Sequence, residues 1–307
     1  MSGSGNDANS STFDNRQTNV GLSGNLGTVT IGRQYTATHA VIGGSDAGSG
    51  NNLIGGTTYV AGNSTSTTAK GGLIATPFYG NSAYVARSSN AVSYSTPAMN
   101  GFTLGLGLSK NFTDSTVAAI DSQTRANSIA LGYANGPLNV AASKTNLKAK
   151  LTNATAGTSV GLMGVMGSVA LYDVTQTETA LGGSYDLVKA KLFANYLKTE
   201  AEGTNGGAAF GNNAKRTAYE MGVQAPVYGA VSAFAKYGKG KTNLVDATNI
   251  SGATAGSFDF STYQIGANYA LSKRTNAYLI YGSAKADLDA TKTAKDTATA
   301  IGLRHQF

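Results

Sequence analysis

The chain repeatedly alternates apolar and non-apolar residues in short segments. The pattern is clearest at residues 102–108 (FTLGLGL), 217–223 (TAYEMGV) and 263–269 (YQIGANY). Because successive side chains of a β-strand point to opposite faces, this alternation predicts strands with one apolar and one polar face. Weaker copies of the pattern occur at residues 127–133, 138–144, 178–185, 190–197, 230–237 and 275–282.

The connections between these segments alternate strictly between short and long. Tight connections lie at residues 24–27, 97–101, 134–137, 186–189, 225–229 and 270–274. Long polar stretches lie near residues 36–88, 109–126, 145–177, 198–216, 238–262 and 283–297. Six short turns make six hairpins, and a last strand at residues 298–307 brings the expected number of strands to about thirteen.

This asymmetry predicts an all-β fold, an antiparallel transmembrane β-barrel with short periplasmic turns and long extracellular loops. With the short turns on the periplasmic side, aromatic residues of the apolar strand face gather at two levels. The inner level holds Tyr133, Tyr185, Tyr269 and Phe307, and the outer level holds Tyr219, Tyr237, Tyr263 and Tyr281. Two such aromatic girdles are typical of a membrane barrel. The alternative is that these are ordinary strand tyrosines favoured by β propensity.

Composition narrows the choice of protein class. Among the 307 residues there is no cysteine, which excludes a disulfide framework and thiol chemistry. No apolar run reaches the 18 or more residues that a membrane-spanning helix needs. The net charge of +7 comes from scattered Lys and Arg residues without a nucleic-acid-binding motif, so nucleic acid is not an expected partner. Residues 1–15 are polar and glycine-rich and show no apolar region of a signal peptide.

Catalytic chemistry finds no support in the sequence. The two histidines, His39 and His305, and the sparse carboxylates give neither metal-ligand spacing nor a pairing of nucleophile and base. We therefore expect neither an enzyme nor a cofactor.

Four stretches resemble a known family, the trimeric general porins of Gram-negative bacteria, in particular their anion-preferring proteobacterial type. Residues 15–33 look like that family's fourth and fifth strands, and residues 87–97 look like the sixth. Residues 271–275 resemble the last periplasmic turn, and residues 302–307 resemble the final strand. The resemblance implies a homotrimer in the outer membrane and passive diffusion of small hydrophilic solutes and ions.

Porins of this family have sixteen strands, and the three that should precede Asn15 are absent from the sequence. Residues 1–307 therefore look like a single barrel domain without its N-terminal strands. An odd number leaves the first and last strands running the same way, so closure between them would need a parallel seam. Because unpaired backbone groups in lipid are costly, we expect that this chain alone does not form a normal pore.

The resemblance also implies a constriction. The loop at residues 36–86 would fold inward and narrow the pore opposite a wall cluster that includes Arg16, Arg33 and Arg87, with Asp46 as the one acid of the loop. Strand alternation alone points Arg16 and Arg33 toward lipid, where an arginine at the membrane midplane costs roughly 2 to 4 kcal/mol. A strand-end irregularity that turns them to the lumen would remove this conflict, which the sequence leaves open, and solvated strand-end positions are the alternative.

Alternation by itself predicts that Lys236, Arg304 and Glu220 face the lumen. Basic residues along a narrow aqueous path favour anions, so we predict anion preference. The terminal Phe307 resembles the signal that the barrel-assembly machinery recognises. The other expected partners are membrane lipid and lipopolysaccharide.

Two other functions fit a barrel of this kind. A structural or adhesive outer-membrane protein would have a plugged interior and surface-binding loops. A substrate-selective channel would carry an aromatic ladder along its lumen, and the sequence shows none.

Overall fold

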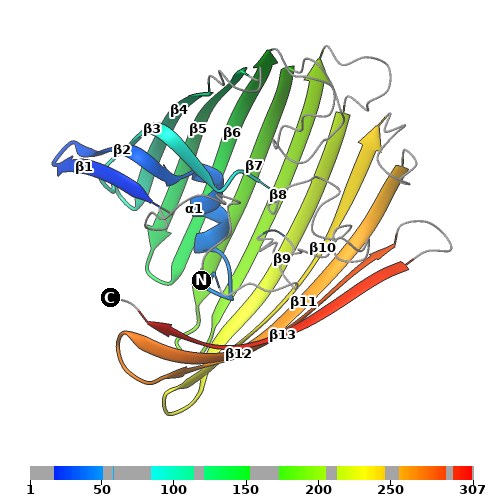
Figure 1. The fold of residues 1–307 in the computed structure, drawn as a ribbon. Coiled ribbons are helices and arrows are strands. Elements are labelled where there is room, and N and C mark those ends of the chain that lie inside the picture. Colours follow the sequence, from blue (N-terminus) through cyan, green and yellow to red (C-terminus); the bar gives the residue numbers. More distant parts are fainter. Residues whose placement is uncertain are drawn as a thin grey trace.

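In a computed structural model, the chain forms one long curved antiparallel sheet with a short helix against its concave face (Figure 1). The structure describes residues 17–50, 58, 84–113, 121–152, 173–204, 213–245, 256–287 and 293–305. The sheet has thirteen strands, and each is hydrogen-bonded to the next strand in the sequence. The all-β prediction and the expected number of strands are confirmed.

The strands are short at the start of the chain and long from β4 onward. They are β1 (Thr18–Gly24), β2 (Gly27–Tyr35), β3 (Arg87–Ser95), β4 (Phe102–Thr113), β5 (Asp121–Asn135), β6 (Leu138–Thr152), β7 (Asp173–Asp186), β8 (Lys191–Thr204), β9 (Asn213–Tyr228), β10 (Val231–Val245), β11 (Gly256–Ala270), β12 (Thr275–Asp287) and β13 (Thr293–His305). The helix is α1 (Ala37–Gly44), which follows β2.

The two ends of this order, β1 and β13, form the two edges of the described sheet. Every neighbouring pair is antiparallel, so among thirteen strands the first and the last run in the same direction. The two edge strands thus run in the same direction, as predicted. If the sheet is to close into a barrel with antiparallel neighbours throughout, an odd number of further strands must lie between β1 and β13.

The distribution of apolar and polar side chains over the two faces of the sheet is the reverse of that in a soluble β-sandwich. Its convex face carries large apolar side chains that are about half exposed, among them Leu131, Ile265 and Leu279. The concave face instead buries polar side chains, of which Thr199 and Gln264 are examples. A soluble protein rarely exposes so extensive an apolar surface, whereas a membrane barrel presents that surface to lipid.

Several strands extend further than the sequence predicted. The stretch at residues 145–177, expected as a loop, contains the last part of β6 and the first part of β7. The same correction applies to the polar stretches near residues 109–126, 198–216, 238–262 and 283–297. The reason is visible on β6, where the outward residues change from Val140 to Lys148 while the backbone ladder to β5 continues. Hydrophobic alternation therefore ends before the hydrogen-bonded strand does.

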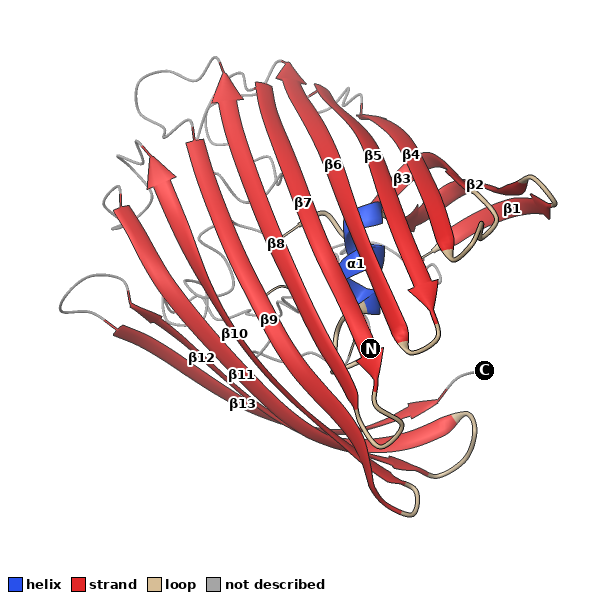
Figure 2. Ribbon diagram, turned by 180° about the vertical axis from the view of Figure 1, so that it is seen from behind, coloured by secondary structure: helices blue, strands red, loops and turns tan. Residues whose placement is uncertain are grey.

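The helix α1 was not predicted. In Figures 1 and 2 it lies within the curve of the sheet, and its contacts are with β4 to β8. Among the described residues, no helix has the length and apolar character required to cross a bilayer.

Candidate functional site

The candidate site is built around a segment that leaves β2 and lies on the concave face of the sheet. We call its described parts, residues 36–50, Thr58 and residues 84–86, the inner segment. Its helix begins at Ala37 because Thr36 caps it, with Oγ1 accepting a hydrogen bond from the His39 amide at 3.2 Å. Val41 and Ile42 on α1 are buried against the sheet in a small apolar cluster with Tyr84, Ala180 and Leu197.

Two glycines of the wall make room for the inner segment. A Cβ atom at Gly182 on β7 would lie 2.8 Å from Ser45 Cβ and 3.0 Å from the Val41 carbonyl oxygen. A Cβ atom at Gly222 on β9 would lie 2.6 Å from Ala47 Cβ. Real Cβ contacts do not reach such distances, so both positions require glycine for the segment to approach the wall as it does.

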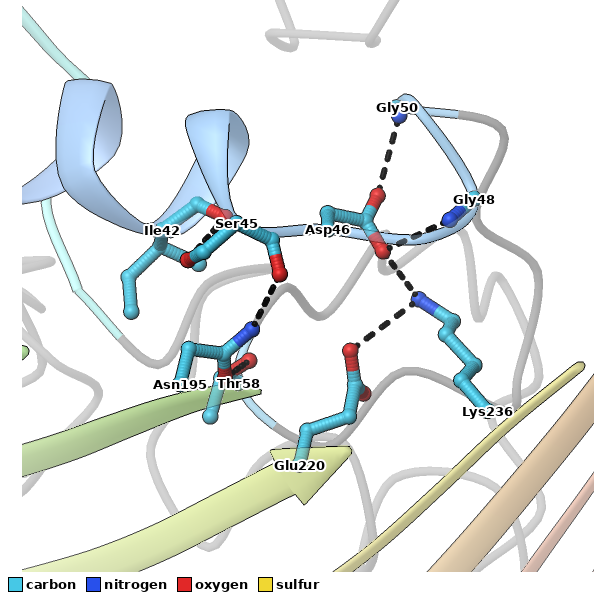
Figure 3. Close-up of polar contacts among 9 residues, drawn as sticks. All are labelled: Ile42, Ser45, Asp46, Gly48, Gly50, Thr58, Asn195, Glu220 and Lys236. Atoms are coloured by element: carbon cyan, nitrogen blue, oxygen red, sulfur yellow. Dashed lines mark hydrogen bonds and ion pairs between the residues drawn. The ribbon is translucent and has the colours of Figure 1, made fainter. Parts of the chain in front are cut away.

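A buried ionic cluster joins the inner segment to the far part of the wall (Figure 3). Lys236 Nζ on β10 lies 2.8 Å from Asp46 Oδ1 and 3.4 Å from Glu220 Oε1 on β9, and the three side chains are at most 2% exposed. Asp46 also accepts hydrogen bonds from the amides of Gly48 at 3.1 Å and Gly50 at 2.9 Å. Buried charges of this kind are tolerated only when paired, so the cluster fixes the position of Asp46.

Neutral hydrogen bonds hold the same segment to β8. Asn195 Nδ2 donates to the Ser45 carbonyl at 3.1 Å, and Asn195 Oδ1 accepts from the Thr58 hydroxyl at 2.6 Å (Figure 3). Ser45 in turn donates to the Val41 carbonyl at 2.7 Å and so closes the end of α1. One wall asparagine thus contacts two separate parts of the inner segment.

The returning end of the inner segment is anchored by a buried carboxylate. Glu178 Oε1 on β7 accepts hydrogen bonds from the Val85 amide at 2.7 Å and from Gln176 Nε2 at 2.6 Å. Thr36 donates its hydroxyl to the Val85 carbonyl at 2.7 Å, which joins the two ends of the segment. The described parts of the inner segment are therefore held against the wall at Asp46, Thr58 and Val85.

Arg33 and Arg87 lie on β2 and β3 at the base of the inner segment, and both are half-buried. Arg33 Nη1 donates to Ser89 Oγ at 2.7 Å, and the Arg87 guanidinium lies 5.6 Å from the ring centre of Tyr35. Tyr35 stacks on His39 of α1, with 4.0 Å between the ring centres. An irregularity in the β2–β3 register lies between Gly32 and Gln34, next to Arg33. The role of both arginines in permeation stays a prediction.

The other predicted residues are distributed over the sheet. Lys236 and Glu220 lie together in the ionic cluster, whereas Arg304 is exposed near the end of β13, with Nε 3.4 Å from Asn276 Oδ1. Arg16 and Phe307 lie outside the described residues.

The seven remaining girdle residues are exposed or half-buried at outward-facing strand positions. They are Tyr133, Tyr185, Tyr219, Tyr237, Tyr263, Tyr269 and Tyr281. Their contact with membrane interfaces stays a prediction.

Beside α1 the concave face borders a partly open cavity of about 330 Å³. Its lining includes Ala37 and Val41 of α1 and the small wall residues Ser93, Gly107 and Ser128. Small polar and glycine residues on this part of the wall leave space between α1 and strands β3 to β5. This space is a candidate path for a small hydrophilic solute.

Sequence patterns did not identify several residues that build this site. Glu178 and Asn195 sit at inward positions of predicted strands, but nothing near them in the sequence marks them as anchors. Gly182 belongs to a strand in which glycine is merely common. The sequence did contain one indication of α1, because threonine favours helix N-caps and Thr36 precedes residues that can form a helix.

Among the described residues, no group of three or more metal-ligating side chains occurs.

Comparison with known proteins agrees with this architecture. The profile of the family described as Gram-negative porin matches residues 2–289. An outer membrane porin protein of Bordetella pertussis is 33% identical over 248 residues, which are 72% of this chain and 58% of that protein. The outer membrane porin protein 32 of Delftia acidovorans is 27% identical over 280 residues, which are 89% of this chain and 65% of that protein. The chain thus spans less than two thirds of the length of these two relatives.

Solved structures show the same fold. An anion-selective porin from Comamonas acidovorans superposes with a TM-score of 0.61 at 23% identity and covers 96% of this chain and 78% of that chain. A loop-deletion mutant of OmpT, an outer membrane protein of Vibrio cholerae, superposes with a TM-score of 0.62 at 17% identity, over 94% of this chain and 78% of that chain.

Proposed function

The chain belongs to the Gram-negative porin family, and from this premise we propose that it serves in an outer-membrane β-barrel that conducts small hydrophilic solutes and ions passively. One observation carries the proposal: the sheet is apolar on its convex face and polar on its concave face, and the inner segment is fixed on that concave face. Such an arrangement suits a water-filled path that the segment narrows.

We further propose that the pore prefers anions. Asp46 is the only acid of residues 36–86, and Lys236 already pairs with it at 2.8 Å. Lys236 also pairs with Glu220, so it offsets part of the acidic charge of the cluster, and the anion preference rests on the positive charges of Arg33 and Arg87. In a narrow path of lowered dielectric constant, such charges attract anions and repel cations. The porin from Comamonas acidovorans with the same fold is named anion-selective.

The assembly that we propose is a homotrimer in the outer membrane. Support comes from the family and from the OmpT of Vibrio cholerae, a protein of similar fold whose structure is described as a trimer form. Membrane lipid and lipopolysaccharide are the proposed neighbours of the convex face. Recognition of Phe307 by the barrel-assembly machinery belongs to the same proposal.

Planar-bilayer recording of the protein purified from outer membranes tests the function. A passive pore gives stepwise current increments whose conductance rises in proportion to salt concentration. In a tenfold gradient of potassium chloride, the sign of the reversal potential should show chloride preference. A plugged structural or adhesive barrel would insert without any current, and that result would overturn the proposal.

A further inference from the structure

A row of buried side chains crosses three strands of the concave face, β8, β9 and β10, which are neighbours in the sheet (Figure 1). Thr199 on β8 and Thr242 on β10 each pair in register with Arg216 on β9, which stands between them. All three side chains are at most 1% exposed, whereas the adjacent Lys215 and Lys241 are exposed on the convex face. We call these three buried residues the arginine row.

An aromatic ring supports the guanidinium group of Arg216. The Cζ atom of Arg216 lies 4.1 Å from the centre of the Phe260 ring on β11, which is a cation–π contact. The ring lies over Gly240 on β10, where a Cβ atom would be 2.7 Å from two of its carbon atoms. Position 240 therefore has to be glycine for the ring to lie there. A contact with a ring uses none of the N–H donors of the guanidinium.

The arginine row is distinct from the arginines at the base of the inner segment. Arg33 and Arg87 stand on β2 and β3, several strands away around the sheet. Arg216 also differs in height from the ionic cluster, because it lies four positions from Glu220 along β9, about 13 Å nearer the long connections. The row thus occupies a place on the concave wall that the constriction does not use.

Thr242 contributes a hydroxyl group that indicates a ligand. Its Oγ1 atom is buried and makes no hydrogen bond with any residue that the structure describes. Buried hydroxyl groups in folded proteins almost always have a hydrogen-bond partner. Because Thr242 stands directly opposite Arg216 in the ladder, a ligand that accepts the hydroxyl proton lies next to a cation.

The donors of the arginine row fit an oxyanion. A guanidinium presents its N–H groups in a fixed fork that matches the oxygen atoms of a phosphate, and a threonine hydroxyl can donate one further hydrogen bond. A chloride ion offers a single centre and matches such a fork less well. Phe260, Ala284 and Ala286 make the surroundings apolar, which strengthens the attraction between a cation and a bound anion.

We propose that the arginine row binds a small oxyanion of the phosphate type through the guanidinium of Arg216 and the hydroxyl of Thr242. The inference rests on the proposed function, because the anion must reach the concave face through water. It deepens that function by adding a saturable binding site, with its own chemistry, to a path that is otherwise selective only by charge.

Thermal unfolding of the detergent-purified protein in sodium phosphate, at constant ionic strength, tests the site. A ligand that binds the folded state raises the unfolding midpoint, and the concentration dependence gives its dissociation constant. Thr242→Val, which replaces the hydroxyl by a methyl group, should weaken phosphate binding about tenfold. Without phosphate its midpoint should not fall, because no described residue loses a hydrogen bond. The matched control Thr262→Val, another buried threonine of the concave face, should keep the dissociation constant.

Arg216→Met should abolish the effect of phosphate, and Arg216→Lys, which keeps the charge but loses the fork, should weaken it less. Folding of each variant is checked by circular dichroism, and Thr242→Val carries the test where a change at Arg216 prevents folding. The proposal fails if phosphate stabilises the protein no more than chloride does, or if Thr242→Val binds phosphate as tightly as the unchanged protein.

Chloride conductance in planar bilayers is measured in parallel. Normal conductance without an effect of phosphate on the unfolding midpoint would overturn the oxyanion site alone. Phosphate binding without any conductance would overturn the pore and leave the binding site standing.

Discussion

Gly182 on β7 and Ser45 at the end of α1 are in such close approach that a Cβ atom on the glycine would lie 2.8 Å from Ser45 Cβ. The wall strand and the inner segment are therefore fitted to each other at this point. The proposed path depends on that fit, because a side chain at position 182 would displace the segment from the wall.

Replacement of Gly182 by valine should move the inner segment without preventing barrel formation. The backbone of β7 tolerates valine, a good strand former, and only the contacts with Ser45 and Val41 are lost. We expect a changed single-channel conductance with an unchanged β-sheet signal in circular dichroism. The control is Gly105→Ala, where the new Cβ would lie 3.6 Å from its nearest neighbour, Ala130 Cβ. Equal conductance of both variants and the original protein would contradict the fit.

Replacement of Lys236 by methionine should destabilise the protein and loosen the inner segment. The change leaves Asp46 and Glu220 buried without the cation that pairs with both. Breaking a buried ion pair by removing one partner costs about 3 kcal/mol or more. We expect a lower midpoint of thermal unfolding and a noisier single-channel current.

Two further variants control this result. Lys198→Met breaks an exposed pair with Glu200 and should change neither midpoint nor current noise. The triple variant Asp46→Asn/Glu220→Gln/Lys236→Met removes every charge of the ionic cluster and should recover most of the lost stability, because no unpaired charge stays buried. A Lys236→Met midpoint equal to that of the unchanged protein would show that the cluster does not hold the segment.

Glu178 should act through its hydrogen-bond acceptor atoms rather than through its charge. Glu178→Gln keeps an oxygen that accepts from the Val85 amide, whereas Glu178→Leu leaves that amide without its partner. An unsatisfied buried donor costs about 1 to 3 kcal/mol, so the leucine variant should lower the free energy of unfolding by that amount. The glutamine variant should unfold close to the midpoint of the original protein. Equal losses in both variants would instead assign the effect to the charge.

The arginines at the base of the inner segment should set ion preference. Replacing Arg33 and Arg87 by glutamine removes two cations beside the proposed path, so the reversal potential in a potassium chloride gradient should shift toward that of an unselective pore. Lys215→Gln, which removes an exposed cation from the convex face, should leave the reversal potential unchanged. An unaltered potential in the double arginine variant would exclude both residues from ion selection.

The sequence allowed the sheet to be predicted well because lipid and water impose different side chains on its two faces. The alternation at residues 102–108 corresponds to β4, and the short connection at residues 134–137 corresponds to the turn between β5 and β6. The upper ends of the strands were missed because their outward residues are polar. Lys148 and Lys150 interrupt the apolar alternation, although their backbone still pairs with β5.

The candidate site was harder to predict from the sequence than the sheet. Asp46 and Lys236 are 190 positions apart in the sequence, and their pairing depends on how the inner segment crosses the concave face. Alternation placed Lys236 and Glu220 on one predicted face, but it carries no information about a partner from another part of the chain. The contacts of Glu178, Gly182 and Asn195 with the inner segment depend on the same long-range packing.

Thiol labelling of two neighbouring residues on β5 tests most directly whether the concave face is a water-filled path. The sequence contains no cysteine, so Ser128→Cys and Ile129→Cys each introduce a single thiol. Ser128 lines the cavity beside α1, and Ile129 is exposed on the convex face. With a charged, membrane-impermeant thiol reagent, Ser128→Cys pores should lose conductance in planar bilayers, and Ile129→Cys pores should not react. Reaction at position 129 with none at position 128 would contradict the account.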